Sequence, residues 1–87
     1  MDNNIESKLT EYLLNCEVML EDNTDVSISQ TVIDKTIESF SVVEDEDHYY
    51  ASDFIHYLVQ EISTEQGQGL LNIGSIEEDE IEEILNS

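Results

Sequence analysis

Positively charged residues are almost absent from the chain. Its 87 residues include two lysines and no arginine, against 22 aspartates and glutamates, and the formal net charge at pH 7 is −20. Most carboxylates therefore have no cation of the same chain to pair with. A net charge of this sign also repels nucleic acid and anionic lipid surfaces, so the composition argues against direct nucleic-acid binding and against binding to a membrane.

Cysteine is also scarce, and long apolar runs do not occur. Cys16 stands alone, so no intramolecular disulfide framework can form, and a reducing cytoplasm is the expected location. No stretch approaches the roughly 18 consecutive apolar residues of a membrane span. Residues 1–6 lack the basic and apolar segments of a signal peptide. We therefore expect a cytoplasmic protein.

Proline is missing, and the chain contains neither an internal repeat nor a low-complexity linker. Hydrophobic residues make up 39% of the sequence, which is enough for one modest core in a chain of this length. We predict a single acidic domain over residues 1–87. Residues 77–87 are the part most prone to fray, because six of the seven residues from Glu77 to Glu83 are acidic and like charges one helical turn apart repel each other.

Apolar residues recur at three- and four-residue spacing over most of the chain, which is typical of amphipathic helices. The pattern predicts a first helix over residues 4–22, with Cys16 on its buried face as an inert packing residue. It predicts a further helix over residues 52–65 that ends at Gly67, and a last helix over residues 76–85. Three or four such helices are enough to enclose a small core.

The segment over residues 26–43 fits two structures. Ser27 and Gln30 have the spacing of a helix capping box, as Ser75 and Glu78 do for the last helix. Valine, isoleucine and threonine are frequent in this segment, however, and some of them alternate with serine as in a strand. We therefore predict a mainly α fold, a small three- or four-helix domain. The alternative is an α+β fold with a small sheet around residues 26–43.

Residues that could perform catalysis or bind a metal do not form a recognisable motif. Asp45 and Asp47 begin a pattern like a calcium loop, but the central glycine is missing and His56 occupies the position of the final glutamate. His48 and His56 are accompanied neither by the paired cysteines of a zinc site nor by an H-E-x-x-H pattern. Phosphate-binding loops and nucleophile motifs are also missing. We therefore expect no enzymatic activity, no metal and no cofactor.

Two acidic runs, Glu44–Asp47 and Glu77–Glu83, are the candidate binding segments. A solvated surface would explain many of the acids but not the near absence of lysine and arginine. Carboxylates three or four residues apart on a helix lie about 5–6 Å apart, comparable with successive phosphates, and twenty charges match about ten base pairs of DNA. The predicted partner-binding residues are Glu44, Asp45, Glu46, Asp47, Tyr49, Tyr50, Glu77, Glu78, Asp79, Glu80, Glu82 and Glu83.

In size, charge and scarcity of cysteine, the whole chain resembles the acidic DNA-mimic inhibitors of phages and mobile elements, the class that contains anti-restriction and anti-CRISPR proteins. The resemblance implies a non-catalytic protein that blocks the DNA- or RNA-binding groove of a basic nucleic-acid-binding protein in the host cytoplasm. Such partners include nucleases, CRISPR effectors and restriction enzymes.

A second resemblance rests on Asp47, Tyr49 and Tyr50, which are similar to the acids and the tyrosine pair of the bacteriocin DNase immunity proteins. Ala51 stands where those proteins have proline. This resemblance implies one alternative function, and a subunit of another class is a second. The chain is either an immunity protein of a basic nuclease toxin, or a regulatory or scaffold subunit that binds a basic helix through apolar patches while its charge steers association.

Overall fold

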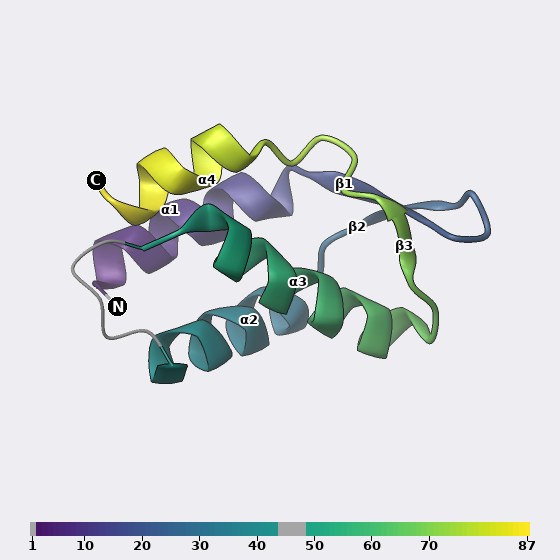
Figure 1. Ribbon diagram of the computed structural model, residues 1–87, viewed down its shortest axis with the longest axis horizontal. Helices are drawn as coiled ribbons and strands as arrows, with labels where there is room; N and C mark the ends of the chain where they lie inside the picture. Colours follow the sequence, from purple (N-terminus) through teal and green to yellow (C-terminus); the bar gives the residue numbers. More distant parts are fainter. Residues whose placement is uncertain (1, 44–48) are drawn as a thin grey trace.

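The computed structural model describes residues 2–43 and 49–87. Within these residues the chain forms, in order, α1 (Asn3–Leu14), β1 (Glu17–Leu20), β2 (Asp25–Ser27), α2 (Gln30–Val43), α3 (Ala51–Gln66), β3 (Leu70–Asn72) and α4 (Glu78–Leu85). The predicted mainly helical domain is confirmed, and a small antiparallel sheet accompanies the helices. This sheet lies at the end of the 38 Å long axis that is remote from both termini (Figure 1). None of the helices described is long and apolar enough to cross a membrane.

The first helix is short and capped at its start. Asp2 is the N-cap residue, and its carboxylate accepts a hydrogen bond of 2.6 Å from the backbone N–H of Asn4, which satisfies one of the free donors of the first turn. Leu9 and Leu13 lie one turn apart and are fully buried. Together they fix the face of α1 that packs on the core.

The predicted continuation of this helix to residue 22 is wrong. After α1 ends, Cys16, Val18 and Leu20 are buried while the residues between them are more exposed. That alternation is the pattern of a strand with one buried face, here β1. Helical spacing was misleading because Cys16 and Leu20 also lie four residues apart, so these two positions fit both periods.

β1 is the central strand of the sheet, with β2 and β3 paired antiparallel on either side. Val18 pairs with Val26, and Leu20 pairs with Leu70. The alternative prediction of a small sheet is therefore right about its presence, but only β2 overlaps its predicted location around residues 26–43. Most of that segment forms α2, whereas β1 lies within the predicted first helix and β3 lies between the helices predicted over residues 52–65 and 76–85.

The start of α2 is capped by Ser29. Its hydroxyl oxygen accepts a hydrogen bond of 3.2 Å from the backbone N–H of Val32 and donates one of 2.9 Å to the carboxylate of Glu65. The capping box predicted at Ser27 and Gln30 is wrong, because Ser27 still belongs to β2. The cap lies two residues further along and also ties α2 to the end of α3.

The contact between α2 and α3 contains the aromatic part of the core. The rings of Phe40 and Phe54 are 5.4 Å apart in an edge-to-face arrangement, which is favourable for the quadrupoles of two aromatic rings. Leu58 is fully buried one turn further along α3. The helix predicted over residues 52–65 is confirmed, and it ends as expected at Gly67, whose φ of 73° is left-handed.

The last helix starts later than the predicted residues 76–85. Ser75 does not form the capping box with Glu78, because its hydroxyl accepts a hydrogen bond of 3.1 Å from the backbone N–H of Glu17 instead. The segment before α4 is thereby attached to β1. The fraying expected for residues 77–87 stays a prediction, and the burial of Ile81 and Leu85 at the core opposes it.

Candidate partner-binding surface

The second acidic run lies on α4 and on the residue that precedes it. Ile81 and Leu85 face the core, so Asp79, Glu80 and Glu83 project from the exposed side of the helix. Asp79 and Glu83 are four residues apart, and Glu80 and Glu83 are three apart, which separates their Cβ atoms by about 5–6 Å. We call the exposed acids of this run the α4 acidic face: Glu77, Glu78, Asp79, Glu80 and Glu83.

Glu82 has a different environment, because its carboxylate is engaged inside the molecule. It accepts a hydrogen bond of 2.7 Å from the backbone N–H of Ala51, one of the donors that the first turn of α3 leaves without a helical partner. Asn86 holds the same segment, donating to the carbonyl oxygen of Tyr49 (2.8 Å) and accepting from its N–H (3.1 Å). Glu82 and Asn86 therefore join α4 to the start of α3.

The two tyrosines of the predicted site have unlike surroundings. Tyr49 is partly buried, and its ring lies 5.7 Å from that of Phe40. Tyr50 is 52% exposed at the N-cap position of α3. A partner can reach the ring of Tyr50, whereas Tyr49 contributes to the core. The first acidic run, Glu44–Asp47, lies outside the described residues.

Tyr12 lies beneath the α4 acidic face, and sequence reasoning did not assign it to the site because it fits the apolar stripe of α1. Its hydroxyl oxygen accepts a hydrogen bond of 3.0 Å from the backbone N–H of Glu77. Burial, together with the neighbouring Glu80 carboxylate, raises the pKa of Tyr12 from 10.0 to about 12. Tyr12 therefore links α1 to the first turn of the acidic helix.

We expect Tyr12→Phe to lower the free energy of unfolding at neutral pH by about 0.5–1.5 kcal/mol, since the N–H of Glu77 loses its acceptor. The folded-state pKa is raised, so the stability linked to the bound proton is present below pH 10.0 and is lost as pH rises toward about 12. The difference in free energy of unfolding between the parent protein and Tyr12→Phe should therefore decrease over this pH range. Denaturant unfolding at a series of pH values measures it, and equal pH slopes for both proteins would contradict the assignment.

Other carboxylates hold loops together. Glu21 accepts a hydrogen bond of 2.7 Å from the backbone N–H of Gly69. Asp22 accepts hydrogen bonds from the side chain of Gln68 (3.1 Å) and the N–H of Thr24 (3.0 Å), and these bonds lower the pKa of the Asp22 carboxyl. Both acids fasten the β1–β2 turn to the loop between α3 and β3, so they stabilise the fold rather than belong to the binding surface.

The lysines do not neutralise the acidic surface. Lys8 on α1 donates a long hydrogen bond of 3.4 Å to the hydroxyl of Ser87, and Lys35 is exposed on α2. Within residues 2–43 and 49–87, neither lysine forms an ion pair with a carboxylate. The described part of the chain also brings together no group of three or more histidine, cysteine or acidic side chains that could hold a metal ion. The exposed carboxylates of the described residues that accept no hydrogen bond inside the protein therefore meet water or a partner's cations.

Added salt should raise the melting temperature of the protein. Mutual repulsion of a net charge of −20 on a molecule with a radius of gyration of 12.2 Å opposes folding, and mobile ions screen that repulsion. A gain of about 1 kcal/mol corresponds to about 4–8 °C for a domain of this size. Thermal unfolding in increasing sodium chloride, with potassium chloride as a control for ion-specific binding, measures the effect. A melting temperature that falls steadily from low salt would contradict it.

The fold and the site define a small acidic α+β domain that presents carboxylates on a helix anchored to its core. Comparisons of the chain with protein-family models, with curated proteins and with solved structures find no match. The arrangement of the carboxylates must therefore carry the functional assignment.

Proposed function

We propose that the protein is a non-catalytic inhibitor that mimics nucleic acid and occupies the DNA- or RNA-binding groove of a nuclease or another DNA-handling protein, such as a CRISPR effector or a restriction enzyme. The observation that carries the proposal is the α4 acidic face. Its carboxylates are exposed on a helix whose Ile81 and Leu85 are fixed in the core. Lys8 lines the groove between α1 and α4 together with Glu80 and Glu83 but forms no ion pair with a described carboxylate.

A nucleic-acid-binding groove suits this surface for electrostatic reasons. Such a groove carries lysine and arginine side chains that neutralise phosphates and release their counterions. Carboxylates at helical spacing can take the same positions, and a helix held by the core loses little freedom on binding. The remaining negative charge of the chain speeds the encounter with a basic surface through long-range attraction.

The proposal is tested by capture from cell extract on the immobilised protein. We expect low salt to retain a basic nucleic-acid-binding protein, and we expect both high salt and added duplex DNA or RNA to release it. A matched column carries the protein with Asp79→Asn, Glu80→Gln and Glu83→Gln. A protein retained equally by both columns, and not released by nucleic acid, would contradict the proposal in favour of binding through apolar patches.

A further inference from the structure

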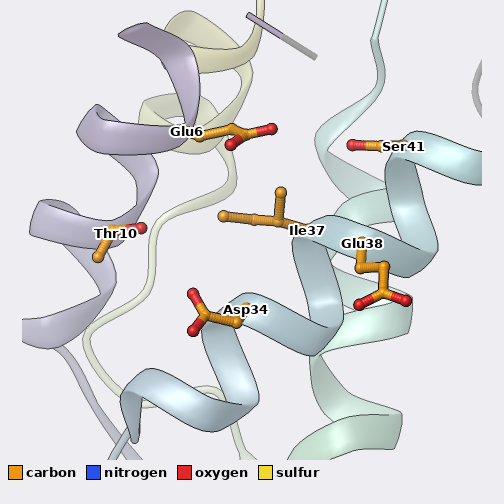
Figure 2. Close-up of a pocket in the computed structure, with 6 residues that line it drawn as sticks. All are labelled: Glu6, Thr10, Asp34, Ile37, Glu38 and Ser41. Carbon is orange, nitrogen blue, oxygen red and sulfur yellow. The ribbon is translucent and has the colours of Figure 1, made fainter. Parts of the chain in front are cut away.

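A second acidic feature lies between α1 and α2, away from the α4 acidic face. The two helices enclose a groove of about 410 Å³, and none of the described residues that line it is basic. In Figure 2 the carboxylates of Glu6 and Asp34 and the side chain of Ile37 project from opposite helices into the space between them. The lining residues are Glu6, Thr10, Asp34, Ile37, Glu38 and Ser41.

Some polar groups of this groove have no partner in the described part of the chain, although the Asp34 carboxylate accepts a hydrogen bond of 2.9 Å from the side chain of Gln30. The hydroxyl oxygen of Ser41 is buried and has no hydrogen-bond partner within residues 2–43 and 49–87, whereas the buried Thr36 hydroxyl on the same helix donates to the carbonyl of Val32 at 2.8 Å. Leaving a buried hydroxyl unsatisfied is unfavourable, so Ser41 is an exception to the usual pattern. Among the described residues, the carboxylates of Glu6 and Glu38 also have no hydrogen-bond or ion-pair partner.

The chemistry of the groove selects one kind of occupant. Carboxylates on two helices and a buried hydroxyl are acceptors, and Ile37 supplies an apolar wall, so the matching ligand is a cation with several donors on an aliphatic stem. A guanidinium has five N–H donors in a fixed plane and can bond to acceptors on both helices, while an ammonium concentrates its charge at one point. The described residues hold no cluster suited to a metal ion.

We propose that the α1–α2 groove receives an arginine side chain of the basic partner, with its stem against Ile37 and its guanidinium bonded to Glu6 and the Ser41 hydroxyl, while Glu38 adds negative charge at the edge of the groove. This inference rests on the proposed function and adds a second contact to it. The α4 acidic face replaces phosphates along the partner's nucleic-acid-binding groove, whereas the α1–α2 groove of this protein encloses a single side chain of the partner. An arginine is the expected occupant because basic grooves use it where bidentate bonding to anions is needed.

The test uses short oligo-arginine and oligo-lysine peptides as probes, with binding followed by NMR on the isotope-labelled full chain. We expect the amide signals of residues 6–10 and 34–41 to shift at lower concentrations of the arginine peptide than of the lysine peptide. Glu6→Gln with Glu38→Gln should weaken binding about fivefold to tenfold. The control, Asp25→Asn with Asp53→Asn, makes the same change in charge on β2 and α3 and should weaken it less than about twofold.

Ser41→Ala separates a binding role from a structural one. Removing an unsatisfied buried hydroxyl should leave the melting temperature unchanged or higher, while arginine binding weakens by about threefold. Equal losses in the groove and control variants, or equal binding of both peptides, would overturn the arginine site. The α4 neutralisation tests the proposed function separately: if only the α4 variant loses its partner, the groove inference fails and the proposed function stands.

Discussion

The variant with Asp79→Asn, Glu80→Gln and Glu83→Gln is expected to bind a basic partner at least about tenfold more weakly than the parent, because it removes three anions at phosphate-like spacing. The substitutions keep the size and nearly the helix propensity of each side chain. Titration calorimetry or surface plasmon resonance measures the loss, and repetition at several salt concentrations should give a shallower salt dependence for the variant.

A matched variant distinguishes the α4 acidic face from net charge. Glu17→Gln, Asp25→Asn and Asp53→Asn remove the same number of charges from β1, β2 and α3, where the side chains are exposed. If affinity depends on position, this control binds within about threefold of the parent. Equal losses of affinity in both variants would mean that the charge acts only by attraction at a distance. If neither variant lost affinity, the α4 acidic face would not be part of the interface.

Gly74→Ala is expected to have the largest effect on stability of any single glycine substitution, about 3 kcal/mol. Gly74 has a φ of 58°, and a Cβ at this position would meet the carbonyl oxygen of Glu17 in β1. Backbone atoms cannot move aside as a flexible side chain does. The loop before α4 would have to separate from β1, and the hydrogen bond of 3.1 Å from the N–H of Ser75 to Glu17 would break with it.

Gly67→Ala is the control for this substitution. Gly67 also has a left-handed φ, 73°, but a Cβ there would have no atom within 4 Å. The cost should be about 1 kcal/mol, from the left-handed conformation alone. Denaturant unfolding of the two variants compares them directly. A similar loss for both would show that the close approach of the loop to β1 is not important for stability.

Elements whose signal lies within neighbouring residues were predicted correctly, whereas those that depend on distant pairing were not. α3 was predicted nearly to the residue because Phe54, Leu58 and their neighbours repeat over several turns and a glycine closes the helix. Residues 16–20 were assigned to a helix because positions four apart satisfy both the helical and the strand period. Pairing of β1 with β2 and with β3, the latter fifty residues away in the sequence, decides between them.

The candidate site was predictable in part for a similar reason. Charge runs are visible in any sequence, so the α4 acidic face could be named, but the engagement of Glu82 with Ala51 depends on how α4 packs beside α3. Tyr12 looked like a core residue because the spacing of apolar residues does not reveal that its hydroxyl reaches the N–H of Glu77. The α1–α2 groove has no sequence signal, because its acids are isolated on two helices that meet only in the fold.

The central claim is that this protein and nucleic acid occupy the same site on the partner. The most direct measurement is a competition assay in which the partner is saturated with a labelled duplex and the protein is titrated in, with fluorescence anisotropy reporting the bound duplex. We predict complete release of the duplex, with an apparent affinity for the protein that falls in proportion to the duplex concentration. A stable ternary complex of partner, duplex and protein, detected by size-exclusion chromatography with light scattering, would contradict the account.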